Sequence, residues 1–251
     1  MRISLVQCAV PTEGIDITLN VIENIIGNGS GADIYVLPEL FATGQCAVPA
    51  EVAQEMDGQI VRWMLDMASR LDAAIAGSVT IGSNDNIYNR FCLAKPDGNV
   101  DFYDKRHLVS YSRENRLYTA GKDRVIMEFR GLRILPQVCY DLRFPVFSRN
   151  RDDDDIVLYV ANWPVKRQIA WDILLRARAI ENQAFAAGVN IVGEDMFGTY
   201  EGHSALIGPY GEYIAVSDSA TPQIITGDLD MDSLVRYRSK FPVIDDADRF
   251  W

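Results

Sequence analysis

Residues 132–145 read LRILPQVCYDLRFP, an apolar run that ends at a cysteine and continues into a polar turn. The run from Leu132 to Val138 is typical of a buried β-strand, and Pro145 is of the type that opens short helices. Cys139 is therefore expected on a sharp turn between strand and helix, where backbone N–H groups converge beside an exposed thiol. This position suits a nucleophile with an oxyanion site, although a lone cysteine also fits a small buried apolar residue.

Outward from this turn, β-rich runs alternate with amphipathic runs in both directions. Strands are predicted at residues 3–10, 33–37, 73–79, 125–129, 132–138 and 156–161, and a hairpin is predicted over 87–105. Helices are predicted at 18–26, 59–71 and 170–184. Such an order predicts sheets covered by helices in a layered α/β fold. No Pro/Gly/Ser linker or fixed repeat divides the chain, so we expect a single domain over residues 1–251.

Two of these helices are predicted from apolar residues that recur at helical spacing. The helix at 18–26 carries its pattern on Val21, Ile22, Ile25 and Ile26. The helix at 170–184 carries its pattern on Ala170, Ile173, Leu174, Ala177, Ile180 and Ala184. Amphipathic helices of this kind turn their apolar stripe toward the core.

The composition excludes several classes of protein. The chain has 251 residues, with 24 Lys and Arg against 35 Asp and Glu, and its formal charge of −11 argues against nucleic acid or an anionic membrane as partner. Four cysteines lie far apart without C-x-x-C spacing, so neither a disulfide scaffold nor a structural zinc site is expected. No G-x-G-x-x-G motif or P-loop indicates a cofactor.

The amino-terminal run MRISLVQCAV is too short in apolar residues for a signal peptide, and no long apolar segment follows. A cytoplasmic protein with reduced thiols is the expectation. The acidic run Asp152–Asp155 is the one charge block in the sequence, and we expect it to be a solvated loop before the next strand.

Two charged residues stand at the ends of other predicted strands. Glu39 follows the apolar run that ends at Pro38, and Lys105 ends the second strand of the 87–105 hairpin. Taken singly, Glu39 fits a solvated strand end and Lys105 a surface ammonium. Together with Cys139 they supply a base, a cation and a sulfur nucleophile. Covalent acyl transfer needs a nucleophile, a proton carrier and donors for an oxyanion, and side chains of these three types are able to supply them.

Three blocks resemble the signatures of the nitrilase superfamily of carbon–nitrogen hydrolases, in the right order. They are VLPELFATG (36–44), FYDKRHL (102–108) and ILPQVCYDLRFP (134–145). The resemblance covers essentially the whole chain, because it continues through ANWP (161–164), RARAIENQAF (176–185) and GHSALIGPYGE (202–212). CYDLRFP, ANWP and the tail KFPVIDDADRFW (240–251) are most similar to the bacterial ω-amidase branch.

The resemblance implies an α/β fold of the nitrilase type, a four-layer α-β-β-α sandwich that pairs into homodimers or larger homo-oligomers. It implies a catalytic set of Glu39, Lys105 and Cys139, with Glu114 in SRENRLYTAG as a supporting glutamate. The implied activity is hydrolysis of the terminal amide of 2-oxo dicarboxylic acid monoamides through a Cys thioester. The substrate is thus a small amide, and neither a metal nor another cofactor is implied.

Four further residues are predicted to bind the substrate. The backbone N–H of Tyr140 is placed to hold the oxyanion beside Lys105. Arg143 is a candidate clamp for a substrate carboxylate, with a bracing ion pair in the turn as the alternative. Asn162 and Trp163 end the next strand at the same sheet edge and are expected to line the acyl pocket, although Trp163 also fits simple packing.

Three alternatives stay open from the sequence. A Cys–His enzyme would use His107 or His203 as its base. A binding protein could keep the fold without the chemistry. Within the superfamily, a nitrilase, an N-carbamoyl hydrolase or an aliphatic amidase would use the same three residues on another substrate.

Overall fold

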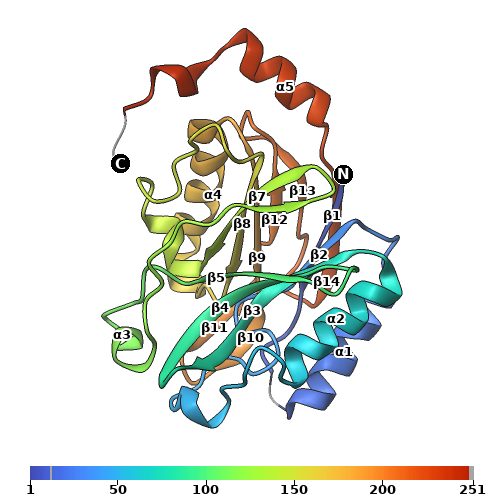
Figure 1. Cartoon of the computed structure of the whole chain (residues 1–251), viewed down its shortest axis with the longest axis vertical. Helices are drawn as coiled ribbons and strands as arrows, with labels where there is room; N and C mark the ends of the chain where they lie inside the picture. Colours follow the sequence, from blue (N-terminus) through green and yellow to red (C-terminus); the bar gives the residue numbers. More distant parts are fainter. Residues whose placement is uncertain (12, 249–251) are drawn as a thin grey trace.

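The computed structural model describes residues 1–11 and 13–248 and contains two six-stranded mixed sheets with helices outside them (Figure 1). One sheet has the order β14-β1-β2-β3-β4-β5, with bounds Gln223–Asp228, Arg2–Gln7, Ile34–Val36, Ala74–Ser83, Asn86–Ala94 and Val100–Asp104. The other has the order β13-β12-β9-β8-β7-β6, with bounds Tyr213–Val216, Ala205–Ile207, Phe185–Asn190, Ile156–Ala161, Leu132–Val138 and Met127–Phe129. Five α-helices accompany them within the described residues: α1 Ile15–Gly27, α2 Gln59–Leu71, α3 Glu114–Leu117, α4 Gln168–Asn182 and α5 Met231–Lys240.

Three buried clusters of apolar side chains define four layers. The central cluster joins the two sheets, with Ile3 and Val36 from one and Ile134 and Leu158 from the other. A second cluster lies between α1, α2 and the first sheet, and a third lies between α4 and the second sheet. Helix, sheet, sheet and helix therefore stack in that order, and the predicted α-β-β-α sandwich is confirmed.

The strand directions bring the ends of distant strands together. β2 runs parallel to β3, β4 is antiparallel to β3, and β5 is antiparallel to β4, so β2 and β5 end at the same edge of their sheet. In the second sheet β7, β8 and β9 are parallel. Parallel strands place their carboxyl ends together, which is where ligands bind in α/β folds. Glu39, Lys105, Cys139 and Asn162 all follow such strand ends.

Only part of the predicted apolar pattern of α4 faces the core, where Ala170 and Leu174 pack against the third cluster. Ile173 and Ile180 are 61% and 48% exposed, whereas Trp171 and Leu175 are buried against the sheet. The sheet accepts them because β9 carries Gly188 at this point, where a Cβ would lie only 2.5 Å from a Leu175 methyl carbon. Apolar residues occupy both faces of α4, so periodicity alone could not choose between them. Val21 of α1 is likewise exposed, although its neighbours Ile22 and Ile26 are buried.

The prediction that Asp152–Asp155 is solvated is wrong for its second half. Asp154 and Asp155 are buried, and arginines bind both. Arg124 binds Asp154 at 3.1 Å, and Arg133 binds Asp155 at 2.7 Å. The run is thus the core of an ion network whose cations come from other parts of the chain. We call it the arginine cluster, defined as Asp153, Asp154 and Asp155 with Arg124, Arg133 and Arg238.

Two local details differ from the sequence-based expectation. Helix α5 had no predicted counterpart, although the Asp230 side chain accepts from the N–H of Ser233 and caps it. The short helix after β7, η2 (Cys139–Arg143), begins at Cys139 itself, so Pro145 follows it rather than opening it. The aromatic residues that end the tail, Phe250 and Trp251, lie outside the described residues. Within the described ranges, no helix has the length and apolarity needed to span a membrane.

Candidate active site

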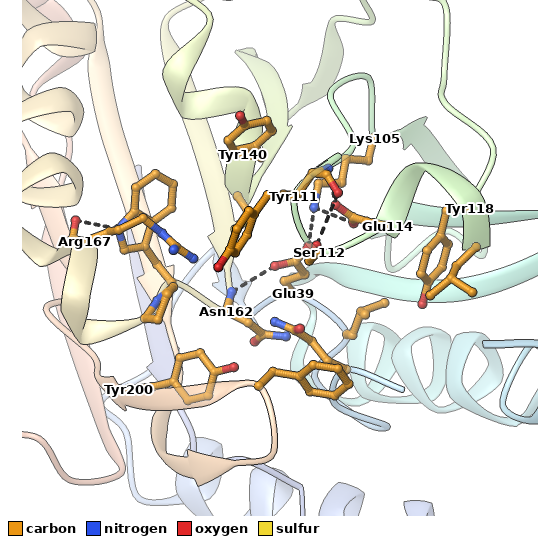
Figure 2. A pocket seen from close by; sticks show the side chains of 18 of the residues that line it. Glu39, Lys105, Tyr111, Ser112, Glu114, Tyr118, Tyr140, Asn162, Arg167 and Tyr200 are labelled. Atoms are coloured by element: carbon orange, nitrogen blue, oxygen red, sulfur yellow. Dashed lines mark hydrogen bonds and ion pairs between the residues drawn. The ribbon is translucent and has the colours of Figure 1, made fainter. Parts of the chain in front are cut away.

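A cavity of about 470 Å³ lies where the carboxyl ends of the two sheets meet (Figure 2). All eight site residues predicted from the sequence line it: Glu39, Lys105, Glu114, Cys139, Tyr140, Arg143, Asn162 and Trp163. The fold therefore brings together side chains that are up to 124 positions apart, from Glu39 to Trp163. The volume is in the range of pockets that hold small molecules.

Cys139 occupies a backbone conformation that most residues avoid. Its φ angle is +47°, in the left-handed region, where a non-glycine residue is strained. The Asp141 carboxylate holds the turn by accepting from the N–H of Val138 at 2.9 Å. This sharp turn ends β7 and points the thiol into the cavity, as the strand-to-helix pattern predicted.

Lys105 is the centre of the charged group. Its side chain is 2% exposed, and Nζ donates to Glu39 Oε1 at 2.8 Å and to Glu114 Oε1 at 2.7 Å. Glu114 is fixed in turn, because its Oε2 accepts from the N–H of Val109 at 2.8 Å. Figure 2 shows Lys105 between the two glutamates. A supporting glutamate at position 114 thus contacts the cation directly.

Glu39 is held on both of its oxygens. Oε1 accepts from Asn89 Nδ2 at 2.8 Å as well as from Lys105, and Oε2 accepts from the N–H of Asn162 at 2.9 Å. The carboxylate also lies close enough to the Cys139 thiol for its charge to raise the pKa of that thiol. The base, the cation and the sulfur that the sequence suggested are therefore in one contact network.

The surroundings keep Lys105 charged and Cys139 neutral. Burial alone lowers the pKa of Lys105, but the charges of Glu114 and Glu39 outweigh it and raise that pKa well above its usual value. Burial and the charge of Glu39 raise the pKa of Cys139 well above its usual value, and Lys105 opposes this only in part. The resting Cys139 side chain is therefore a thiol, and it would have to give its proton to a base before it could act as a nucleophile.

The far side of the cavity carries cations. The Arg143 guanidinium lies over the ring of Trp163, 5.0 Å from its centre, and Trp163 Nε1 donates to the carbonyl oxygen of Arg167 at 2.8 Å. Among the described residues, no carboxylate forms an ion pair with Arg143 or Arg167. Trp163 is buried and contacts both arginine residues, so this side chain packs in the interior and also lines the cavity.

Neither histidine lines the cavity within the described part of the chain. His107 Nδ1 is 2.7 Å from Asp141 Oδ1, and the ring stacks on Phe144. His203 pairs with Asp172, outside this cavity. The arrangement therefore favours Glu39 over a histidine as the partner of Cys139.

Sequence reasoning missed several residues that shape the site. Asp141 is fully buried and accepts from Tyr103, Val138 and His107, which ties the Cys139 turn to the loop after Lys105. A carboxylate two positions after the nucleophile was the signal that could have revealed it. Asn89 and Tyr200 gave no such signal, because nothing in their local sequence shows that they approach Glu39. Within the described ranges, no group of His, Cys, Asp and Glu is arranged to hold a metal ion.

Comparisons with known proteins agree with this geometry. The model of the carbon-nitrogen hydrolase family matches residues 2–239. The chain belongs to the carbon–nitrogen hydrolase family. The predicted resemblance to the nitrilase superfamily is thereby confirmed.

Relatives of this carbon–nitrogen hydrolase cover most of its length. The omega-amidase YafV of Escherichia coli K12 is 50% identical over 222 residues, which are 88% of this chain and 86% of that protein. The 2-oxoglutaramate amidase of Bacillus subtilis is 32% identical over 86% of this chain and 85% of that protein. The crystal structure of XC1258 from Xanthomonas campestris, a CN-hydrolase superfamily protein with an arsenic adduct in its active site, has a TM-score of 0.96 at 41% identity and covers 100% of this chain and 98% of that one.

Proposed function

We propose that this carbon–nitrogen hydrolase is an ω-amidase that releases ammonia from the terminal amide of 2-oxo dicarboxylic acid monoamides, such as 2-oxoglutaramate and 2-oxosuccinamate. The observation that carries the proposal is the contact network in which Lys105 binds Glu39 and Glu114 beside the Cys139 thiol. The relatives named omega-amidase YafV and 2-oxoglutaramate amidase support the substrate class.

In the first half of the reaction, Glu39 takes the proton of the Cys139 thiol while the sulfur bonds to the amide carbon. Negative charge develops on the carbonyl oxygen, and Lys105 Nζ and the N–H of Tyr140 stabilise it. That N–H lies in the first turn of η2, where N–H groups have no partner within the helix. Protonated Glu39 then gives its proton to the amide nitrogen, ammonia leaves, and a thioester on Cys139 remains.

In the second half, a water molecule gives a proton to Glu39 as its oxygen attacks the thioester carbon. The sulfur leaves and recovers that proton, and the dicarboxylate is released. Glu39 thus carries a proton twice and ends as it began. Lys105 keeps its charge throughout because its pKa is raised well above the usual value by Glu114 and Glu39, against the effect of burial. Glu114 positions this ammonium.

The proposed substrate needs a cation at the end opposite the amide. A net charge of −11 repels an anionic molecule at long range, so a local positive charge has to offset it. Arg143 supplies a planar fork that can bind the carboxylate through two hydrogen bonds. Trp163 holds this guanidinium against its ring, and Asn162 forms the neighbouring wall of the cavity.

The same proposal includes the assembly and the location of the enzyme. The outer face of α4 exposes Ile169, Ile173 and Ile180, an apolar stripe that supports a homodimer or larger homo-oligomer. Four free cysteines support a reducing, cytoplasmic environment. A single carbon–nitrogen hydrolase domain over residues 1–251 is supported by the family match to residues 2–239.

Ammonia release from 2-oxoglutaramate, glutamine, a nitrile and an N-carbamoyl amino acid tests the function. We expect kcat/KM for 2-oxoglutaramate to exceed that for glutamine by about 100-fold. The reason is that glutamine carries an ammonium group close to the carboxylate that Arg143 binds. Preference for the nitrile or the N-carbamoyl compound would assign the chain to another activity of the superfamily.

A further inference from the structure

The buried amide of Asn162, which lines the cavity, has no hydrogen-bond partner among the described residues. Asn162 is 3% exposed and lines the cavity, and its backbone N–H donates to Glu39 Oε2. Among the described residues, neither its Oδ1 nor its Nδ2 forms a hydrogen bond. Folded proteins pair almost all buried polar groups, so an unpaired amide in a cavity indicates a ligand that completes it.

The reacting amide offers the complementary groups. A primary amide presents a carbonyl oxygen, which Lys105 Nζ and the N–H of Tyr140 receive in the proposed reaction, and two N–H donors on its nitrogen. Glu39 already accepts three protein hydrogen bonds and must still receive the thiol proton. Glu39 therefore has little capacity left to accept hydrogen bonds, and a second acceptor for the –NH₂ group has to lie close to Glu39. The backbone N–H of Asn162 binds Glu39, so the Asn162 side chain begins next to this carboxylate and is placed to supply the second acceptor.

Tyr200 lines the same cavity as Asn162 and bears on which way the Asn162 amide points. Its hydroxyl donates its single proton to Asp195 Oδ1 at 3.1 Å, so its oxygen can only accept from a further partner. Figure 2 shows the side chains of Asn162 and Tyr200 together on one wall of the pocket. This polarity favours the orientation in which Nδ2 faces the Tyr200 oxygen and Oδ1 faces the substrate.

We infer that Asn162 is a specificity residue whose Oδ1 accepts a hydrogen bond from the –NH₂ of the scissile amide. This inference rests on the proposed amidase function and adds how the site distinguishes an amide from other acyl derivatives. An ester brings no N–H donor and leaves Oδ1 unpaired. The carboxylate product presents an oxygen to Oδ1, so the contact that binds the substrate opposes retention of the product.

The test compares the ω-amide and the ω-methyl ester of the same 2-oxo acid in wild type and Asn162→Leu, a variant of similar size without polar atoms. We expect kcat/KM for the amide to fall about 30-fold, while kcat/KM for the ester stays within about 3-fold. Gln168→Leu is the matched control, because Gln168 also buries an unpaired amide oxygen but lies outside the cavity lining. Its amide-to-ester ratio should equal that of the wild type.

The inference would be overturned if the amide-to-ester ratio of kcat/KM in Asn162→Leu equalled that of the wild type, whether both values fell or neither did. A monoamide without the 2-oxo group serves as a further substrate: if Asn162→Leu removes the preference for the 2-oxo compound and leaves the amide-to-ester ratio intact, Asn162 binds the oxo group and the inference is wrong. Thermal unfolding verifies that the variant is folded, and Asn162→Ala replaces it if it is not. Failure of the wild type to release ammonia would instead refute the proposed function.

Discussion

The charged group around Lys105 and the arginine cluster both contain buried charge, and they differ in what surrounds them. The catalytic cluster, so named for the reaction that we propose, joins Lys105 to Glu39 and Glu114 and opens into the cavity that also contains the Cys139 thiol. The arginine cluster joins Asp153, Asp154 and Asp155 to three arginines, and none of its members lines that cavity.

The comparison shows that buried charge does not by itself identify an active site. Both clusters contain carboxylates that would be costly to bury without cations. The catalytic cluster shares one ammonium between two carboxylates beside a nucleophile and room for a substrate. The arginine cluster matches its acids with cations from distant segments, which binds those segments together. One arrangement favours proton transfer, and the other favours stability.

Removing the nucleophile should separate the two clusters most clearly. We expect Cys139→Ala to lower kcat by about 10⁵-fold, because no acyl intermediate can form. The free energy of unfolding should change by less than about 1 kcal/mol, because no charge is left unpaired. Ammonia release and urea unfolding measure the two effects.

Cys46→Ala is the matched control, because Cys46 lines the same cavity but its thiol donates to the carbonyl oxygen of Val48. It should keep most of the activity. If Cys139→Ala retained substantial turnover, or if Cys46→Ala lost it, the assignment of the nucleophile would be wrong.

The catalytic cluster was predictable because its residues follow strands. Glu39, Lys105 and Cys139 each end an apolar run, and strands that run in the same direction bring their ends to one edge. The helix at 59–71 and the hairpin at 87–105 were predictable for a similar reason, since spacing and turn residues are local signals. The resemblance to the nitrilase superfamily then supplied Glu114, which the residues alone did not single out.

The arginine cluster was not predictable, because its cations come from other parts of the chain. Arg238 lies 83 positions after Asp155 and still binds it, and nothing near Asp155 in the sequence announces this partner. Asn89 approaches Glu39 from 50 positions away in the same manner. Trp171 and Leu175 of α4 were missed because their burial depends on Gly188 in β9, the strand beneath the helix. Tertiary partners decide all three cases.

Removing a cation from the arginine cluster should affect stability and leave the chemistry intact. Arg124 is 7% exposed at its side chain and binds both Asp153 and Asp154. We expect Arg124→Met to lower the free energy of unfolding by about 3 kcal/mol, because it leaves buried carboxylates without their cation. kcat/KM per folded molecule should stay within about 2-fold, since Arg124 lies outside the cavity.

Arg62→Met is the control for this substitution. Arg62 also pairs with an aspartate, but both side chains are at least 70% exposed, and surface pairs contribute little. A loss of activity in folded Arg124→Met, with unfolding unchanged, would show that the two clusters are coupled and would contradict the division between them.

The smallest effect is a pH dependence of stability. Burial raises the pKa of Asp154 to about 7, and Arg124 opposes this rise only in part. In the unfolded chain the carboxyl has its ordinary pKa of 3.8 and loses its proton first. At pH values between 3.8 and about 7, Asp154 keeps its proton in the folded state but has released it in the unfolded state. Stability from this group therefore falls as the pH rises toward 7 and falls no further above it.

Asp154→Asn removes this titration, so the free energy of unfolding of wild type minus that of the variant should fall by about 3 kcal/mol between pH 5 and pH 8. Urea unfolding of both proteins at the two pH values gives this difference directly, and titrations shared by the two proteins cancel. Asp57→Asn, at an exposed carboxylate, should show no comparable change. If the difference for Asp154→Asn rose with pH instead, Asp154 would be stabilised as a carboxylate by its arginines, and the arginine cluster would hold a charge there as the catalytic cluster does.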